Sequence, residues 1–165
     1  MSVGDVLRLM NERTATLPRT RPAVELLLGD SSFSIRLPQD AEYIRHGREI
    51  VSSIDDKLRY KIGMTFCPHH RFYESTWAYS KNRQQVRDNT RWDHMLILYC
   101  HHCRDAVAML ETALINIFQG GACSRRCRNR RTAFDDYKRF DHGSDDERAM
   151  PGPYFCYVVT GVPQP

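Results

Sequence analysis

A carboxylate at position 111 is the first residue whose type and place suggest chemistry. Glu111 belongs to the segment 104–119, whose apolar residues recur at helical spacing and put Glu111 at the edge of the buried stripe. A carboxylate in such a place loses part of its hydration, so it needs a cation, a hydrogen bond or a metal ion. The alternative is a surface glutamate that reaches from the boundary into solvent.

Two basic residues lie on either side of a strand-ending glycine. The segment 58–63 alternates like a strand, and Gly63 at its end permits a tight turn or a close approach of the backbone. A helix expected over 68–80 then carries Arg71 near its start. Arginine beside the amide groups of a helix start favours an oxyanion such as phosphate, although a solvated arginine is the common alternative. Lys61 points to the second face of the strand and is otherwise an ordinary exposed lysine.

The run YKIGMTFCPHHRFY (60–73) resembles the YIG half of GIY-YIG nuclease domains. In that family a strand with a YIG or KIG element is followed by a threonine and, about ten residues later, by an arginine on the next helix. Ten positions separate Lys61 from Arg71 here. LETALINIF (110–118) resembles the helix that carries the metal-binding glutamate of the family, and CRN (127–129) resembles an element with a structural or catalytic asparagine.

The first half of the motif, a GIY strand, does not directly precede the KIG element. FSIRL (33–37) lies too far upstream, whereas PYFCYVV near the C-terminus offers Tyr157 as the GIY tyrosine. Chain termini often lie close together, so a terminal strand can fill the same slot in a sheet. We therefore interpret residues 58–161 as similar to a circularly permuted GIY-YIG domain, with Lys61 in place of the YIG tyrosine.

The resemblance implies a metal-dependent endonuclease that hydrolyses DNA phosphodiester bonds. Glu111 would bind one divalent cation, Mg²⁺ or Mn²⁺, and Arg71 would hold a non-bridging phosphate oxygen. Tyr157 would orient or deprotonate the attacking water, and Lys61 would lower the pKa of its phenol. Three further residues are expected to position the phosphate: Tyr60, His70 and Tyr73.

Residues 124–131 contain five arginines in eight positions. Such a segment suits sequence-independent contact with a DNA backbone. The expected contact residues are Arg126, Arg128, Asn129 and Arg130. A solvated loop, partly neutralised by the acidic residues of 135–147, is the alternative. The glycine pair that usually follows the asparagine is also missing, so a catalytically inactive nucleic-acid-binding module of the same fold is the second hypothesis.

A zinc-stabilised interaction domain is the third hypothesis. Cys100-x-x-Cys103 and Cys123-x-x-x-Cys127 have the paired spacing of a structural zinc site, and two histidines lie within the first pair. The helix expected between the pairs would be about 24 Å long, which argues against a shared metal. The cysteines are otherwise small core or loop residues.

The composition suits a globular protein with a nucleic-acid partner. Of its 165 residues 41% are hydrophobic, the net charge is +4, and 20 of the 24 basic residues are arginine. A GC-rich genome gives the same arginine bias. No segment approaches the ~20 apolar residues of a membrane span, and the first fifteen residues do not resemble a secretory signal. With six cysteines, we expect an intracellular, reducing compartment, the nucleus or the cytoplasm.

The remaining patterns place these residues in a small domain. Helices are expected within 1–20 and over 39–54, 68–80 and 104–119, strands over 58–63, 95–99 and 153–161, and polar loops over 81–91 and 122–150. This order predicts an α/β or α+β fold, with a three-stranded mixed or antiparallel sheet flanked by helices. We expect residues 56–165 to form this domain and residues 1–55 to form a helical extension.

Overall fold

The computed structural model describes residues 2–15, 32–38, 42–119, 125–129 and 152–165. Within them the elements follow in the order α1 (Val3–Ala15), β1 (Phe33–Ile35), α3 (Tyr43–Ser52), β2 (Arg59–Thr65), η1 (His70–Glu74), α4 (Asn82–Asp88), β3 (Thr90–His101), α5 (Arg104–Gln119) and β4 (Tyr154–Pro163). No helix of this part of the chain has the length and apolar character that crossing a membrane requires.

The sheet places the C-terminal strand between two strands from the middle of the chain. Its order is β1-β3-β4-β2, with β4 antiparallel to both β2 and β3, and with β1 parallel to β3 at one edge. The predicted class, a mixed sheet flanked by helices, is therefore confirmed. The sheet has four strands rather than three, because the FSIRL segment that we set aside supplies β1. A three-residue strand is too short to show a reliable alternation in the sequence.

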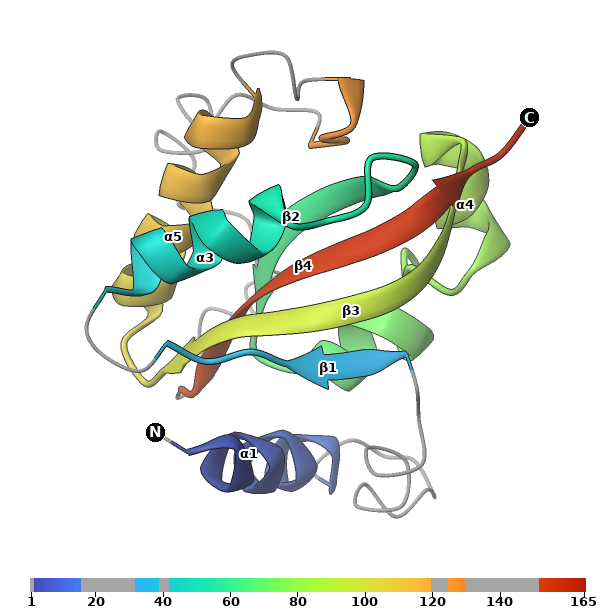
Figure 1. The fold of residues 1–165 in the computed structure, drawn as a ribbon. Helices are drawn as coiled ribbons and strands as arrows, with labels where there is room; N and C mark the ends of the chain where they lie inside the picture. The colour runs from blue at the N-terminus through green and yellow to red at the C-terminus, as the bar shows by residue number, and fades with distance from the viewer. Residues whose placement is uncertain (1, 16–31, 39–41, 120–124, 130–151) are drawn as a thin grey trace.

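Helices cover both faces of the sheet, which explains why β4 is apolar at almost every position. Figure 1 shows α3 and α5 on one side and α1 on the other. Cys156 and Val158 pack on the first side in the α5-side core, which Leu110 and Leu114 of α5 also join. The residues Phe155, Tyr157 and Val159 alternate with them and pack in the α1-side core on the second side, with Val6 and Met10 of α1.

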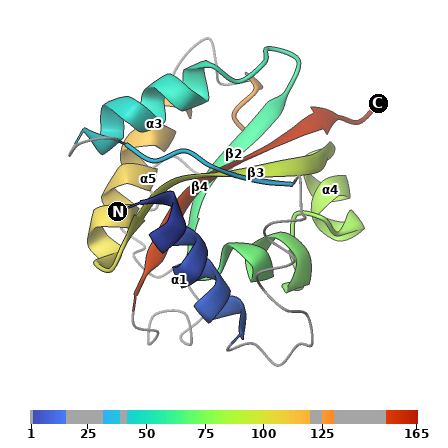
Figure 2. The same cartoon turned by 60° about the horizontal axis from the view of Figure 1, so that its bottom comes forward.

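The helical N-terminal residues share these cores rather than standing apart from them. Val6 and Met10 are buried on α1, and Val51 of α3 packs in the α5-side core. Figure 2 shows α1 lying across one side of the sheet, with α3 and α5 on the opposite side. The described residues of the segment expected to be a helical extension thus contribute α1, β1 and α3 to one layered structure.

The region between β2 and β3 differs most from the predicted elements. Of the expected helix over 68–80, only 68–74 is helical, and it ends in the π-helical segment η1, in which the amide of Ser75 donates to the carbonyl of His70 at 3.0 Å. The expected loop over 81–91 instead contains α4 and the start of β3. The sequence shows no apolar periodicity over α4, because the two buried residues of this helix, Gln84 and Asp88, are polar. Asn89 ends α4 in the left-handed conformation that asparagine tolerates well, with φ 49°.

Two irregularities in the pairing of β3 with β4 change which residues face each core. The register shifts between Trp92 and His94 and again between Ile97 and Tyr99. As a result, Leu98 and Tyr99 both pack on the α5-side core although they are neighbours in the strand. The strand also extends well beyond the expected 95–99, from Thr90 to His101.

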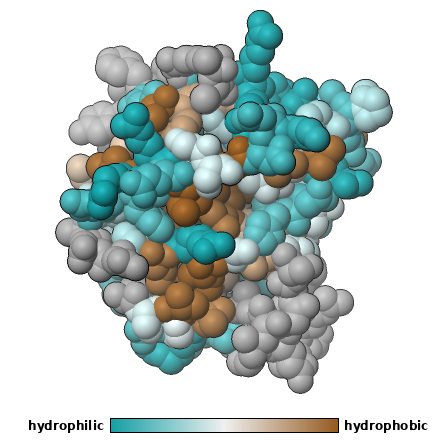
Figure 3. Space-filling model, in the orientation of Figure 1, coloured by the Kyte–Doolittle hydropathy of each residue, from teal (hydrophilic) through white to brown (hydrophobic). Residues whose placement is uncertain are grey.

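The surface of the view in Figure 1 divides into two kinds of region. Figure 3 shows apolar side chains gathered over α1 and the neighbouring edge of the sheet, within a mostly hydrophilic surround. Val3 of α1 and Ile44 of α3 are among the large apolar residues that remain exposed.

The close pairing of β3 and β4 depends on a glycine at position 161. A Cβ atom there would lie 2.8 Å from the carbonyl carbon of Arg91 and 2.9 Å from Cα of Trp92, so two backbones would have to separate. We expect Gly161→Ala to lower the free energy of unfolding by about 1–3 kcal/mol, as overpacking does elsewhere. Gly4→Ala is the matched control, because a Cβ at that position meets only Ser2 Oγ at 3.7 Å. Urea denaturation of both variants measures the difference, and equal stabilities would contradict this account.

Candidate functional site

The register of β4 and β2 brings the expected tyrosine and the KIG element together. Gly63 pairs directly with Tyr157, and Lys61 pairs with Val159. A Cβ atom at position 63 would lie 2.6 Å from Cζ of Tyr157, so only glycine leaves room for the tyrosine ring across β2. The terminal strand therefore lies directly beside the strand that carries the KIG element.

Tyr157 forms a buried polar cluster with Arg71 and Tyr79. Arg71 Nε donates to the Tyr157 hydroxyl at 3.4 Å, and the hydroxyls of Tyr79 and Tyr157 are 3.0 Å apart. Tyr157 is only 2% exposed. Burial raises the pKa of Tyr157 well above its ordinary value, Tyr79 raises it further, and the positive charge of Arg71 only partly opposes them. The phenol is therefore neutral near pH 7 and acts here as a hydrogen-bonding group.

Arg71 is the cation of this cluster, and its placement suits an anion. The guanidinium lies 5.0 Å over the ring of Tyr79 and is only partly buried. Arginine is protonated in proteins under ordinary conditions, and the oxygen of Tyr157 raises the pKa of Arg71 further. Among the described residues no carboxylate forms an ion pair with Arg71. A partly buried arginine whose neighbours are phenols rather than carboxylates retains its capacity to bind an oxyanion.

Lys61 lies on the same face but has a different partner from the one expected. Its ammonium donates to Asp88 Oδ2 at 2.6 Å, and the same oxygen accepts from Gln84 at 2.7 Å and from the indole of Trp92 at 3.2 Å. Burial lowers the pKa of Lys61 to about 8, and the hydrogen bond and charge of Asp88 oppose that fall. We expected Lys61 to act on the phenol of Tyr157, but the structure places Arg71 in that role.

Glu111 lies on the opposite side of the sheet from this cluster. It is partly buried on α5, next to Cys156, whose side chain packs in the α5-side core. Burial raises the pKa of the Cys156 thiol, and the negative charge of Glu111 adds to that rise. Cys156 and Tyr157 are neighbours in β4 and point to opposite faces. The structure thus brings Lys61, Arg71 and Tyr157 to one face and leaves Glu111 on the other.

The three residues expected to position a phosphate are mostly packed against protein. Tyr60 is 1% exposed in the α5-side core, with its ring edge against Phe118. Tyr73 packs on the α1-side core, and its ring lies 4.8 Å from that of Phe72. His70 is partly exposed, with its Nδ1 3.3 Å from a carboxylate oxygen of Glu74. Of these three, Tyr60 is the one that is fully buried.

The arginine-rich segment is partly used to hold the protein together. Arg126 donates to the carbonyl oxygens of Ile54, Asp55 and Leu58 at 2.7–3.1 Å and to the carboxylate of Asp56 at 2.9 Å. The side chain of Arg126 therefore has a structural role, because it links the arginine-rich segment to residues 54–58. Arg128 pairs with β2 through its backbone amide, which donates to the carbonyl of Tyr60 at 2.8 Å. Arg130 lies outside the described residues.

Asn129 completes the exposed edge of β2. Its Oδ1 accepts from the amide of Ile62 at 3.0 Å, and its Nδ2 donates to the carbonyl of Ile62 at 2.7 Å. The carboxamide thus pairs with β2 as a neighbouring strand would, next to the bridge between Tyr60 and Cys127. Of the two roles that the resemblance allows for this asparagine, the structural one matches these contacts.

The cysteines expected to bind zinc are not gathered in the described part of the chain. Cys100 packs in the α1-side core and Cys127 in the α5-side core, on opposite faces of the sheet. Cys103 is exposed, and Cys123 lies outside the described residues. Within the residues that the structure describes, no three His, Cys, Asp or Glu side chains are grouped to hold a metal ion.

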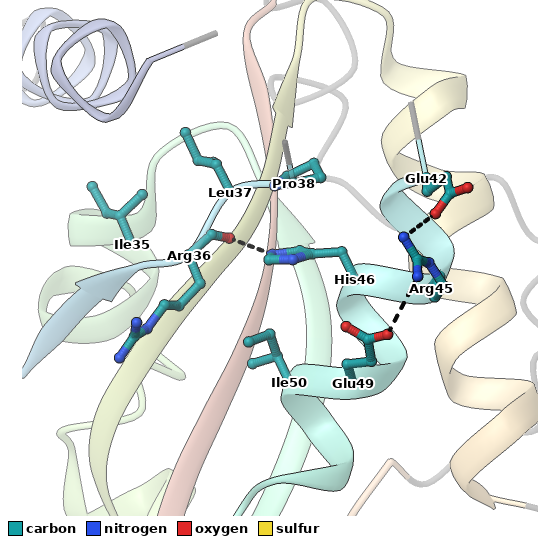
Figure 4. Close-up of a pocket in the computed structure, with 9 residues that line it drawn as sticks. All are labelled: Ile35, Arg36, Leu37, Pro38, Glu42, Arg45, His46, Glu49 and Ile50. Atoms are coloured by element: carbon teal, nitrogen blue, oxygen red, sulfur yellow. Dashed lines mark hydrogen bonds and ion pairs between the residues drawn. The ribbon is translucent and has the colours of Figure 1, made fainter. Parts of the chain in front are cut away.

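A shallow pocket of about 390 Å³ lies between residues 35–38 and α3. Figure 4 shows the ring of His46 pointing to the carbonyl of Arg36, with a separation of 2.9 Å, and Arg45 lying between Glu42, which precedes α3, and Glu49 of α3. Both acidic residues of the lining thus pair with Arg45.

The sequence analysis missed three side chains that complete the buried network. Tyr79 ended an expected helix, and Gln84 and Asp88 lay in an expected loop. The only available signal was an acid four residues before Trp92 in an otherwise basic segment. Charge alone could not show that Asp88 would be buried against Lys61.

Comparison with known proteins adds no assignment for this arrangement. No protein-family model, curated protein or solved structure matches the chain.

The buried Lys61–Asp88 pair predicts an unusual titration. We expect the Lys61 ammonium to titrate near pH 8, followed by NMR of its side-chain resonances. Asp88→Asn removes a carboxylate that raises the pKa of Lys61, so the midpoint should fall further. An unchanged or higher midpoint in the variant would show that Asp88 does not act on Lys61 in solution.

The role of Asn129 at the edge of β2 is tested by two substitutions. Asn129→Ala should lower the free energy of unfolding by about 1–2 kcal/mol, because it leaves both backbone groups of Ile62 without their partner. Asn129→Asp retains an acceptor for the amide but loses the donor to the carbonyl, so it should also destabilise the fold. Thermal unfolding measures both effects. A variant as stable as wild type would contradict the structural role.

Proposed function

We propose that this chain is a GIY-YIG-like domain that binds the phosphate backbone of DNA and hydrolyses it as a metal-dependent endonuclease. The observation that supports the proposal most is that Tyr157 of β4 lies opposite Gly63 of β2 and accepts a hydrogen bond from Arg71. These two strands are far apart in the sequence but adjacent in the sheet. This is the juxtaposition that the permuted resemblance requires. A guanidinium without a carboxylate partner in the described residues then supplies a place for an oxyanion.

In this proposal Arg71 binds a non-bridging oxygen of the scissile phosphate. The contacts to Tyr79 and Tyr157 hold the guanidinium in place before the substrate arrives, which lowers the cost of reorganisation in the transition state. Tyr157 orients the attacking water through its neutral hydroxyl. It does not begin as a phenolate, because burial raises its pKa. The hydroxyl of Tyr79 is the nearest group with which Tyr157 can exchange a proton.

The resemblance implies one divalent cation, Mg²⁺ or Mn²⁺, and gives Glu111 as the residue that would hold it. The donor chemistry of Glu111 suits one hydrated hard cation, because Mg²⁺ is often held by one or two carboxylates and retains several waters. Its position does not suit a cation shared with Tyr157, since the two side chains lie on opposite faces of the sheet. The proposal therefore assigns the phosphate to Arg71, and a cation bound by Glu111 would not reach that phosphate.

A second candidate function is a nucleic-acid-binding module of the same fold that does not cleave. Two observations favour it: Tyr157 is almost fully buried, and Glu111 faces the other side of the sheet. Such a module would bind the phosphate of DNA through Arg71 but would not hydrolyse the phosphodiester bond.

A plasmid-nicking assay with Mg²⁺ or Mn²⁺ separates the two functions. Arg71→Ala should reduce the rate about 10²–10³-fold, the usual effect of removing a donor to the transition state. Glu111→Ala tests the metal assignment that the resemblance implies, and an unchanged rate in this variant would show that the cation is held elsewhere. Matched controls are Arg48→Ala and Glu49→Ala, which remove exposed charges from α3 and should leave the rate unchanged. Wild-type protein that binds DNA but does not nick it would indicate the inactive module. Nicking that neither Arg71→Ala nor Glu111→Ala affects would overturn the proposed site.

A further inference from the structure

An exposed tryptophan lies against two arginines beside the proposed site. Trp77, between η1 and α4, is 39% exposed, whereas the only other tryptophan, Trp92, is 2% exposed. The guanidinium carbons of Arg83 and Arg87 lie 4.8 Å and 4.9 Å from the centre of the Trp77 ring. We call these three residues the Trp77 patch. Both arginines are exposed, so two cations and an aromatic ring face solvent together.

The charge around the patch is positive. The segment 81–91 contains four basic residues and a single acid, Asp88, which is 1% exposed. Asp88 pairs with Lys61 in the interior and also with Arg87, whose Nε lies 3.6 Å from Asp88 Oδ1. In the described part of the chain no carboxylate forms an ion pair with Arg83. The solvent-facing side of α4 therefore presents two guanidinium groups, and the carboxylate that pairs with Arg87 is buried.

Stacking on an indole also prepares the arginines for a particular ligand. A guanidinium held flat against an aromatic face keeps its N–H edges directed outward, where they can bind phosphate in a forked geometry. The exposed part of the indole remains a surface on which a base can stack. Bases offer their flat faces only where they are unpaired, so a single strand fits this surface better than a duplex.

We propose that the Trp77 patch binds single-stranded nucleic acid, with Arg83 and Arg87 on successive phosphates and Trp77 against a base. The inference extends the DNA partner of the proposed function to a second surface. The two are linked through Tyr79, which follows Trp77 by two residues and lies beneath Arg71.

The test measures binding of fluorescein-labelled (dT)20 and (U)20 and of a DNA duplex of equal length, using the full chain without divalent metal. We expect the single strands to bind more tightly than the duplex, and Trp77→Ala to weaken that binding about ten-fold or more. Trp77→Phe, which retains an aromatic face, should recover part of the loss. Arg83→Ala and Arg87→Ala should each reduce the dependence of log affinity on log salt by about 0.7. Arg48→Ala, an exposed arginine on α3, is the matched control and should have little effect.

Intrinsic fluorescence gives an independent reading, because Trp92 is buried and Trp77 is not. Saturating (dT)20 should quench the emission that Trp77→Phe removes and leave the rest unchanged. Equal binding by wild type and Trp77→Ala, or self-association through the patch without oligonucleotide binding, would overturn the inference. If plasmid nicking persists in Trp77→Ala with unchanged single-strand binding, the patch is wrong and the proposed function stands. If Trp77-dependent binding occurs without any nicking, the patch stands and the endonuclease does not.

Discussion

The antiparallel pairing of β4 with β2 is the constraint on which the rest of the structure depends. It inserts the last strand of the chain into the interior of the sheet, where helices bury both of its faces. The same pairing sets Tyr157 opposite Gly63, so the ring lies across the one position of β2 that has no side chain to displace it. Arg71 and Tyr79 then close over the hydroxyl from the segment that follows β2. A shift of one residue in this register would turn Tyr157 to the α5 side of the sheet.

Arginine has several distinct uses among the described residues, and the partners of each guanidinium distinguish these uses better than the number of arginines does. Arg126 donates to three backbone carbonyls and a carboxylate, so it fixes the turn before β2. Arg71 lies among phenols, where its charge is retained but not neutralised. Arg83 and Arg87 lie on an exposed indole. An arginine-rich composition therefore gives little information on nucleic-acid contact until the carboxylates near each guanidinium are known.

Much of the framework could be predicted from the sequence because it follows local patterns. The stripe of apolar residues defined α5 at its observed bounds, and the unbroken apolar run near the C-terminus predicted a strand buried on both faces. The placement of Lys61 and Tyr157 on adjacent strands also followed from the motif. The short edge strand β1 and the polar helix α4 could not be predicted in the same way. The hydrogen bonds of β1 come from β3, and the buried residues of α4 are stabilised by contacts with β2 and β3.

The sequence by itself determined the fold class, because helical and strand periodicities are properties of the chain. It also determined which positions carry a basic side chain. The tertiary structure decided which of those residues meet. It paired Lys61 with Asp88, used Asn129 as part of the sheet edge, and separated Glu111 from Tyr157 by the thickness of the sheet. The physical reason is that neighbouring residues of a strand point to opposite faces, so partners are chosen by strand register, and register depends on contacts between segments far apart in the sequence.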